Sequence, residues 1–425
     1  MPDGRLSIFL GGDAMITEPW SEIDDPAFAG LVAEMRAADT TIVNLETVIH
    51  EHKGFAQPES GGIHMASPPA VTGELKWAGI DMVAAANNHS FDYGSAGILE
   101  TLEHIEAEGI CLAGTGRDLQ AARAPAFVSS DAGTVGLVSM ASTFIPYGRA
   151  SNSRPDMHGR PGLNPLTPTK KVAGTITPAL AGTLAGWKFG ARSKCRPARG
   201  DTFRFLGLRF LVGDTLAFNA FRPSVSPIDL AANLQAIATA AGKADVTIAS
   251  VHAHVQSSWL PKFARRAINS GADVVFVHGP HAVRAIEFYA GKPIFYCLGD
   301  FVYQPHRIIR FPAEMYDKHG LGPDATVKDL WPVWETGMGL SSKRKTFEAF
   351  CSVLDFDGGR LERIRLLPLD LQFDAPPEIR GRPRLADAAL GRKIIEEVAV
   401  LSRKRGTVVR YDAARNEGTV ELSRS

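Results

Sequence analysis

The side chains best suited to chemistry form five short polar clusters, each placed after an apolar run of strand length. The clusters are Gly12-Asp13, Asn44-Leu45-Glu46, Asn87-Asn88-His89, His252-Ala253-His254 and His278-Gly279-Pro280-His281. The apolar runs span residues 6–10, 40–43, 82–86, 246–251 and 274–277, and most are rich in β-branched residues, as buried strands are. Strand ends in an α/β sheet converge on one edge, where ligands bind. Carboxylate, amide and imidazole groups meeting there are the ligands that a divalent metal needs.

The segment 87–94 carries the strongest local signal, because an apolar strand ends abruptly in two amides and an imidazole. Asn88 can offer a carbonyl oxygen to a metal, and His89 can donate to a developing oxyanion or move a proton. Asp92 follows three residues later and can orient His89 and fix its tautomer. The structural alternative is a helix start capped by Asn88 or Ser90. The functional interpretation is favoured because the other clusters match it.

Carboxylates follow three of the predicted strands. Asp13 can ligate a hard cation or serve as a base, although a lone Asp after a strand is more often a turn residue or cap. Glu46 and Asn44 end the second strand, and side chains two residues apart lie on the same face of a strand. Asp300 follows the apolar run 294–298, where it can pair with a histidine of a neighbouring loop or occupy a turn.

Histidines follow two further strands as pairs. His252 and His254 alternate across a strand end, so both imidazoles can reach one face. His278 and His281 come after the next strand. A single histidine is most often structural, but two pairs at successive strand ends are hard to explain that way.

The composition sets the broad class of the protein. The chain has 425 residues, of which 45% are hydrophobic, so it can bury a sizeable core. Its 46 basic and 46 acidic residues give a net charge of zero, which does not point to nucleic acid or a membrane as partner. The first residues lack a signal-peptide pattern, and no apolar run is long enough to cross a bilayer. The four cysteines form no CxxC pair, so we expect reduced thiols and a cytoplasmic protein, with homo-oligomerisation left open.

Strands alternate with helices over most of the chain, which indicates βαβ units and a largely buried sheet. In residues 1–145 we expect helices at 26–38, 67–77 and 95–108, and later strands at 110–112 and 135–140. The same alternation resumes with a helix at 226–241 and continues to residue 301.

Two long segments interrupt the alternation. The first, about 146–215, begins with the turn-rich stretch 160–166, and residues 151–215 carry eleven Lys or Arg but only three Asp. A solvated basic surface and a collar that attracts an anionic substrate explain this bias equally well. The second, about 305–346, is expected to be a long connection and a candidate lid.

The C-terminal part is expected to form a β-hairpin, a helix and short strands. The hairpin strands span 347–356 and 361–367 around an Asp-Gly-Gly turn, and the helix spans 385–404. The short strands lie near 408–410 and 419–422. We therefore expect one domain over residues 1–370, containing the basic insertion and the lid, with residues 371–425 packing on it.

The order of the motifs resembles that of the CapA family of capsule and poly-γ-glutamate synthesis proteins. The resemblance covers roughly residues 5–370. The residues that carry it are Gly12-Asp13, Asn44-Leu45-Glu46, Asn87-Asn88-His89 with Asp92 and Gly94, the segment 160–166, Gly279-Pro280-His281, Ile286-Glu287 and the run 293–302. That family is similar to calcineurin-like metallophosphoesterases. The resemblance implies an α/β fold with a central β-sandwich flanked by helices, in four layers α/β/β/α, and a metal site at the strand ends.

Carried over onto this sequence, the phosphoesterase motifs make Asp13 the first metal ligand, and Glu46 replaces a bridging Asp. Two departures matter. Met15 stands where phosphoesterases carry a ligating His, and Gly279 stands two residues before His281, where they carry another. A two-metal displacement needs both ligands, so the chain is better suited to one ion than to two. Ligation by oxygen favours Mn, Mg or Ca over Zn.

The resemblance and the clusters together define the candidate site. The metal ligands are Asp13, Glu46, Asn88, His252 and His278. The catalytic residues are His89, Asp92, His252, His281 and Asp300. The substrate-binding residues are Asn44, His254, Arg160 and Asn164.

The family implies a metal-dependent enzyme of capsule or polymer biosynthesis, acting on a peptidic or poly-γ-glutamate-like polyanion by polymer handling or hydrolysis. One alternative is a metal-assisted peptide Cα epimerase that tailors ribosomal peptides. There, His89 with Asp92, and a second histidine with Asp13 or Asp300, exchange the α-proton from opposite faces. Another is a phosphoesterase, which the missing ligands disfavour. The last is a non-catalytic scaffold of a capsule machine.

Overall fold

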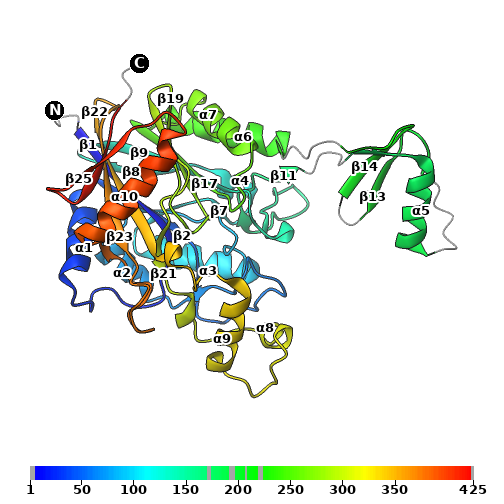
Figure 1. Ribbon diagram of the computed structural model, residues 1–425, viewed down its shortest axis with the longest axis horizontal. Coiled ribbons are helices and arrows are strands. Elements are labelled where there is room, and N and C mark those ends of the chain that lie inside the picture. The colour runs from blue at the N-terminus through cyan, green and yellow to red at the C-terminus, as the bar shows by residue number, and fades with distance from the viewer. Residues whose placement is uncertain (1–4, 170–173, 191–196, 206–207, 219–223, 423–425) are drawn as a thin grey trace. The chain divides into compact units, whose positions relative to one another are not determined.

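The computed structural model describes residues 5–169, 174–190, 197–205, 208–218 and 224–422, and its larger part is built on two β-sheets (Figure 1). The first sheet has ten strands. In spatial order, eight of them are β25 (Val409–Asp412), β26 (Glu417–Val420), β23 (Arg360–Asp370), β22 (Glu348–Asp357), β1 (Arg5–Met15), β2 (Thr40–Leu45), β5 (Met82–Ala84) and β6 (Cys111–Ala113). β21 (Asp300–Tyr303) pairs with β1, and β24 (Arg384–Leu385) pairs with β23. β1, β2, β5, β6 and β21 are parallel, so their carboxyl ends share one edge.

The second sheet has six strands and a parallel centre. In spatial order, they are β19 (Ile286–Tyr289), β20 (Lys292–Phe295), β18 (Val274–His278), β17 (Val246–His252), β9 (Gly133–Ala141) and β8 (Ala126–Ser130). Shorter pairs join β3 (Val48–Ile49) to β4 (Ala66–Ser67) and β7 (Thr115–Gly116) to β10 (Gly162–Leu163).

The two sheets pack face to face over an apolar core. Ile8 and Leu10 from β1 meet Leu137, Ile248 and Phe276 from the second sheet in one buried cluster. The pattern arises because alternate side chains of a strand point to opposite faces, so each central strand is apolar on both.

Helices cover the outer faces of this sandwich. On the first sheet, Phe9 and Val43 pack against Leu31 of α1 (Pro26–Ala37), Leu75 of α2 (Val71–Trp77) and Ile105 of α3 (Gly94–Ala107). On the second, Ala240 of α6 (Pro227–Ala241) lies against Gly136 of β9. The predicted α/β sandwich with helices on both sides is confirmed. One further helix, α4 (Leu119–Arg123), was not predicted, and α7 (Trp259–Asn269) falls within the alternation of strands and helices expected up to residue 301.

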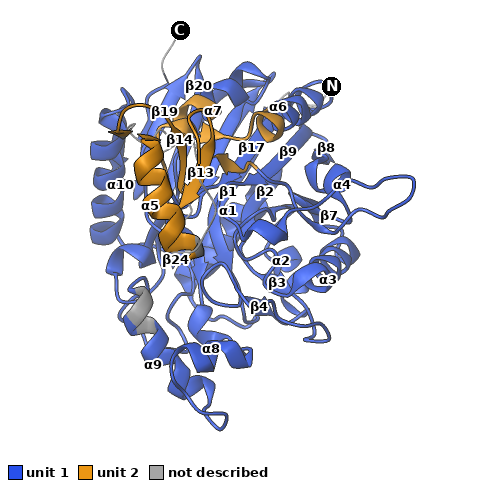
Figure 2. Ribbon diagram, turned by 90° about the vertical axis from the view of Figure 1, so that its right-hand side faces the viewer, with its two compact units in different colours: residues 1–165, 231–255, 264–425 blue, residues 166–230, 256–263 orange. Residues whose placement is uncertain are grey.

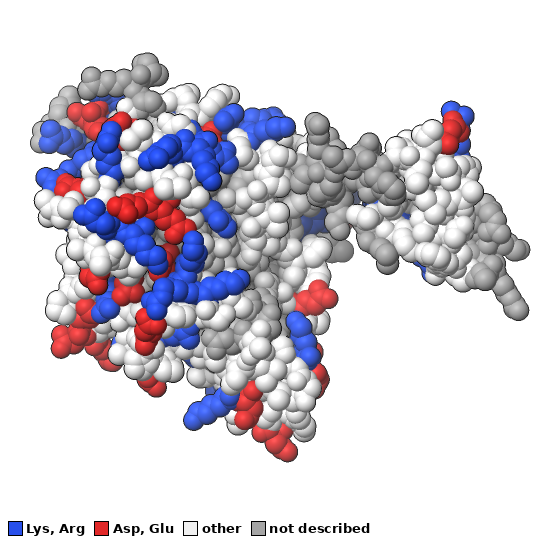
Figure 3. Space-filling model, viewed as in Figure 1, with Lys and Arg blue, Asp and Glu red and all other residues white. Residues whose placement is uncertain are grey.

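Residues 166–230 and 256–263 form a second compact unit (Figure 2). Its sheet has the order β13 (Thr202–Phe205), β14 (Leu208–Val212), β12 (Gly174–Ile176) and β15 (Ala217–Phe218), and β11 (Pro168–Thr169) pairs separately with β16 (Ser224–Val225). α5 (Pro178–Phe189) packs on the first of these sheets through Ala181 and Ala185, which meet Phe203 and Phe210. On the face shown in Figure 3, the described part of this unit is mostly uncharged, whereas both signs of charge are interspersed over the larger unit. Several of the basic residues of 151–215 lie outside the described residues.

The segment 305–346 is not the irregular connection that its Gly and Pro residues suggested. It contains α8 (Ala313–Lys318) and α9 (Val327–Met338), and short 3₁₀ turns lie at its two ends, at Pro305–Arg307 and Arg344–Phe347. A third 3₁₀ turn lies outside this segment, at Pro146–Gly148. Met315, Leu330 and Trp334 are buried against Tyr303 and Phe347. Leu330 and Trp334 are four residues apart, so they share a helix face, and this packing outweighs the Pro332 inside α9.

The expected C-terminal hairpin and helix are confirmed as β22 with β23 and as α10 (Ala388–Arg403). Asp387 caps α10 by accepting a hydrogen bond from the Leu390 N–H, and Ile394, Ile395 and Val398 enter the core between the sheets. β25 and β26 extend the first sheet beyond β23. Among the described residues, no helix has the length and apolar character needed to cross a bilayer.

Candidate metal and acid–base site

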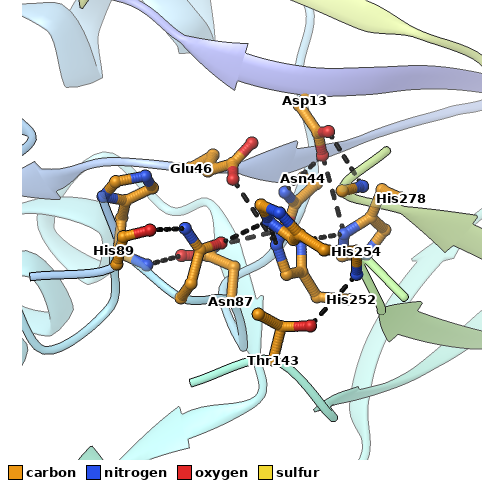
Figure 4. Close-up of polar contacts among 12 residues, drawn as sticks. Asp13, Asn44, Glu46, Asn87, His89, Thr143, His252, His254 and His278 are labelled. Atoms are coloured by element: carbon orange, nitrogen blue, oxygen red, sulfur yellow. Dashed lines mark hydrogen bonds and ion pairs between the residues drawn. The ribbon is translucent and has the colours of Figure 1, made fainter. Parts of the chain in front are cut away.

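The polar clusters meet because strand register aligns them. In the first sheet, Asp13 on β1 stands opposite Asn44 on β2 and Asp300 on β21. In the second, His252 and His278 are direct partners at the ends of β17 and β18. Figure 4 shows Asp13 and Glu46 facing the imidazoles of His252, His254 and His278.

Glycine permits the close approach of β1 to the segment before β21. A Cβ on Gly12 would lie 1.9 Å from the carbonyl oxygen of Gly299, so no other residue fits there without a backbone shift. Gly299 has a φ of +87°, which favours glycine. The Asp13 N–H donates to that carbonyl at 3.4 Å. These two glycines therefore bring Asp13 and Asp300 into one site.

Ligand-type atoms gather in three overlapping sets, each within 4.8 Å. The sets are Asp13–His252–His278, Glu46–His254–His281 and Asp13–His281–Asp300. The imidazole nitrogens nearly touch: Nδ1 of His252 is 2.8 Å from Nδ1 of His278, and Nε2 of His254 is 3.0 Å from Nε2 of His252. Nε2 of His254 also lies 3.1 Å from Oδ1 of Asn88. Nitrogen atoms this close can bind the same cation.

The Glu46 carboxylate provides a direct test of whether a cation fits. Both of its oxygens are buried and have no hydrogen-bond partner among the described residues, and Oε1 is 3.5 Å from Nε2 of His252. Oδ2 of Asp300 is likewise buried and unpartnered. Burying a charge without a partner is costly, so these oxygens need a cation or protons. The donor set fits a divalent metal ion.

Burial raises the pKa of the carboxylate ligands and lowers the pKa of the imidazole ligands. Desolvation raises the pKa of Asp13 to about 7, opposed by the nearby His281 and reinforced by Asp300. The pKa of Glu46 is raised well above its usual value, first by desolvation and then by Asp13. Desolvation lowers the pKa of both His278 and His254 to about 3. These two imidazoles are therefore neutral at pH 7, the form that binds metals.

Neighbouring groups orient the ligands. Asp13 accepts hydrogen bonds from Nδ2 of Asn44 at 2.7 Å and from the Gly279 N–H at 3.0 Å. Oγ of Ser250 lies 2.7 Å from Nε2 of His278, which leaves Nδ1 of that ring facing His252. Such outer partners fix ring orientation and tautomer in metal sites.

Two histidine–carboxylate pairs border the cluster. Nδ1 of His89 is 2.8 Å from Oδ2 of Asp92, and Nδ1 of His281 is 2.8 Å from Oδ1 of Asp300. Burial lowers the pKa of His281, but Asp300, Glu46 and Asp13 outweigh it and raise that pKa to about 10. His281 therefore carries a proton at pH 7, and its φ of +52° is uncommon outside glycine.

The loop before β4 holds the first of these pairs. The Met65 N–H donates to Oδ2 of Asp92 at 2.8 Å, and the Gly61 N–H donates to Oδ1 at 3.3 Å. Nδ2 of Asn88 donates to the Gly61 carbonyl at 3.1 Å. A Cβ on Gly61 would lie 2.5–2.7 Å from atoms of Asn88, so only glycine fits here.

The structure gathers eleven of the predicted site residues and leaves two apart. Asn44 and His254 were predicted to bind substrate but lie inside the cluster, in contact with Asp13 and Asn88. Nδ2 of Asn164 donates to Ser139 and Asn233 at 2.8 Å, so this buried amide ties its loop to the sandwich. The exposed Arg160 donates to the carbonyl of Arg149. The gathered residues are Asp13, Asn44, Glu46, Asn88, His89, Asp92, His252, His254, His278 and His281, with Asp300 bonded to the last of them.

Sequence reasoning gave no role to two residues that organise the site. Asn87 donates to Oδ1 of Asn44 at 3.3 Å and to the Leu45 carbonyl at 2.7 Å, and its own Oδ1 accepts from the His89 N–H. Ser250 supports His278. The signal for Ser250 was its place two residues before His252, on the same strand face.

Comparison with known proteins identifies the family of this chain. The family model described as "Bacterial capsule synthesis protein PGA_cap" matches residues 7–305. The uncharacterized protein y4sH of Sinorhizobium fredii is 30% identical over 95% of this chain and 91% of its own. The PGA biosynthesis protein CapA of Bacillus subtilis is 22% identical over 71% of this chain and 64% of its own. A phosphatase structure from Mycoplasma pneumoniae aligns with 86% of this chain and 94% of that chain at 10% identity and a TM-score of 0.40, too low to add to the fold assignment. The chain belongs to the PGA_cap family of bacterial capsule synthesis proteins.

Proposed function

We propose that the protein is a metal-dependent enzyme of capsule or polymer biosynthesis that hydrolyses amide bonds in a peptidic, poly-γ-glutamate-like substrate. The observation that carries the proposal is the His89–Asp92 pair beside a buried cluster of carboxylates and neutral imidazoles, in which Glu46 has no hydrogen-bond partner among the described residues. The similarity to the PGA biosynthesis protein CapA supports the choice of substrate class.

We assign one ion to Asp13, His252 and His278, with Glu46 as a further donor because its unpaired Oε1 faces His252. Nδ1 of His281 is paired with Asp300, so we leave His281 out of the ligand set of this ion. The mixture of imidazole and carboxylate donors favours Mn over Mg or Ca. When bound, such an ion polarises a carbonyl and lowers the pKa of a water.

His89 is assigned the proton transfer. Asp92 holds Nδ1 of the ring at 2.8 Å, so Nε2 is the nitrogen left to receive a proton and deliver it to the leaving amine. His281, charged and paired with Asp300, would stabilise negative charge that develops on the substrate.

The test is amine release from poly-γ-glutamate and γ-glutamyl oligomers by the Mn-loaded protein. His89→Gln should lower the rate about 10²–10⁴-fold with metal content unchanged, the usual contribution of general acid–base catalysis. His158→Gln, on an exposed loop, is the control and should have no effect. No amine release by the loaded wild type would rule out the proposed reaction.

A second candidate is peptide Cα epimerisation, favoured by the presence of two separate histidine–carboxylate pairs. Two bases on opposite faces of a Cα exchange its proton with solvent. Deuterium uptake at Cα from heavy water, without amine release, would select this reaction. Phosphoesterase activity is disfavoured by Met15 in the ligand position, and hydrolysis of aryl phosphates by the Mn-loaded protein would restore it.

A further inference from the structure

A pocket of about 480 Å³ lies outside the metal cluster. It is lined by Gln57, Pro58, Glu59, Phe91, Tyr147 and Arg160. These residues come from separated segments of the larger unit, and the volume is in the range of small-ligand sites. Phe91 and Tyr147 form an aromatic wall, with ring centroids 6.3 Å apart in an edge-to-face arrangement.

One wall of this pocket is built on the turn that carries His89. The Asp92 N–H donates to the His89 carbonyl at 3.2 Å, which places Phe91 inside that turn. The Gln57 N–H donates to the Asp92 carbonyl at 2.8 Å, so the loop bearing Gln57 and Glu59 rests on the same turn. A ligand in this pocket is therefore held against the segment that positions His89.

The pocket carries one free charge of each sign. Neither Arg160 nor Glu59 forms an ion pair with any residue in the described ranges. Nε and Nη2 of Arg160 donate to the Arg149 carbonyl at 3.3 and 2.8 Å, which fixes the guanidinium and leaves its remaining N–H groups for a ligand. The Tyr147 hydroxyl donates to the Glu59 carbonyl at 3.5 Å. A ligand that satisfies both charges must carry an anion and a cation.

We propose that this pocket binds the amino-terminal residue of a γ-glutamyl chain, with Arg160 on its α-carboxylate and Glu59 on its α-ammonium. In a γ-linked glutamate polymer, every residue has a free α-carboxylate, but only the amino-terminal residue also has a free α-ammonium on the same carbon. The planar guanidinium suits the carboxylate, and the aromatic wall suits the side-chain methylenes. The inference rests on the proposed function and makes the enzyme exo-acting from the amino end.

The test is calorimetric binding of tri-γ-glutamate and its N-acetylated form to the metal-free protein, which is not expected to hydrolyse them. The free-amine form should bind at least roughly tenfold more tightly, since a hydrogen-bonded charge is usually worth that much. Arg160→Gln should weaken both forms about tenfold, and Glu59→Gln should abolish the preference for the free amine. Arg154→Gln is the matched control, because Arg154 is exposed and already paired with Asp156.

Equal binding of the two oligomers by the wild type would overturn the inference, as would a Glu59→Gln variant that keeps the preference. Failure of the proposed reaction is distinguishable, because binding is measured without turnover. A clear preference for the free-amine oligomer without amine release would support the proposed role of the pocket and contradict the proposed hydrolysis. Amine release without a preference for the free-amine oligomer would support hydrolysis and contradict the proposed role of the pocket.

Discussion

The two sheets contribute chemically different halves of the site. The carboxylate half, Asp13, Glu46 and Asp300, comes from β1, the end of β2 and β21 of the ten-stranded sheet. The imidazole half is centred on His252 and His278 at the ends of β17 and β18 in the six-stranded sheet. Neither sheet alone supplies a mixed ligand set, so the site depends on the packing of the sandwich.

Burial acts on the two halves with opposite sign. It raises the pKa of Asp13 and Glu46 and lowers the pKa of His252, His254 and His278, so each half is driven towards its neutral form. A neutral imidazole is already a ligand, whereas a protonated carboxylic acid is a poor one. The imidazole half is therefore prepared for a metal, and the carboxylate half must lose protons to bind it.

The largest effect is expected for Glu46→Gln, which tests the carboxylate half alone. The substitution keeps the shape of the side chain but removes its ability to ionise and bind a metal. Its affinity for Mn should fall by more than about 100-fold, because loss of an outer-shell partner alone typically costs 10–100-fold. The metal-free protein should keep its Tm, since burial already favours uncharged Glu46, while the gain in Tm on adding Mn should disappear.

Glu348→Gln is the matched control for that measurement. Glu348 is another buried carboxylate, but its side chain is bonded to Lys393 of α10 and not to a residue of the candidate site. This variant should lose stability and keep full metal affinity, the reverse of Glu46→Gln. Mn retained by Glu46→Gln at wild-type affinity would remove Glu46 from the ligand set.

The imidazole half is tested through Ser250→Ala, which removes the hydroxyl beside Nε2 of His278. Metal affinity should fall roughly 10–100-fold because the ring loses its fixed orientation. Thr247→Val on the same strand is the control, since the buried Oγ1 of Thr247 has no hydrogen-bond partner among the described residues. Equal Mn affinities of the two variants, measured by chelator competition, would show that Ser250 does not orient His278.

The pH dependence of Mn affinity should identify the half that limits binding. Asp13 in the metal-free protein has a pKa of about 7, so its ligating form is lost as the pH falls below 7. Affinity should drop roughly tenfold per pH unit between 7 and 5 for each proton displaced. His254 and His278, with pKa values of about 3, stay neutral over this range. An affinity that is flat from pH 8 to pH 5 would show that Mn displaces no proton from the carboxylate half.

The positions of these clusters were predictable because parallel strands of β-branched residues end at a common edge. That rule placed His252 and His278 at neighbouring strand ends, and the structure pairs them directly. Long-range partners were not predictable. Asn164 looked like a polar site residue, but its amide is consumed by Asn233, 69 residues away.

Two local features also escaped the sequence-based prediction. α7 carries apolar residues at helical spacing, with Leu260, Phe263, Ala264 and Ala267 buried, but the expected alternation of strands and helices covered this region without giving the bounds of the helix. Gly61 gave no signal at all. Its importance comes from contact with Asn88, which only the folded loop creates.

The smallest expected effect concerns the loop before β4, whose Gly61 and Met65 N–H groups donate to Asp92. Gly61→Ala places a Cβ against Asn88, and relief of that clash should cost about 1–3 kcal/mol of unfolding free energy. The shift should also move Asp92, because Gly61 donates to its Oδ1, so the rate should fall while Mn affinity through Asp13, His252 and His278 stays within a few-fold. Gly73→Ala is the control, since a Cβ there meets nothing within 4 Å. A loss of Mn affinity as large as that of Ser250→Ala would mean that this loop supports the metal ligands themselves, through Asn88, rather than the proton-transfer pair.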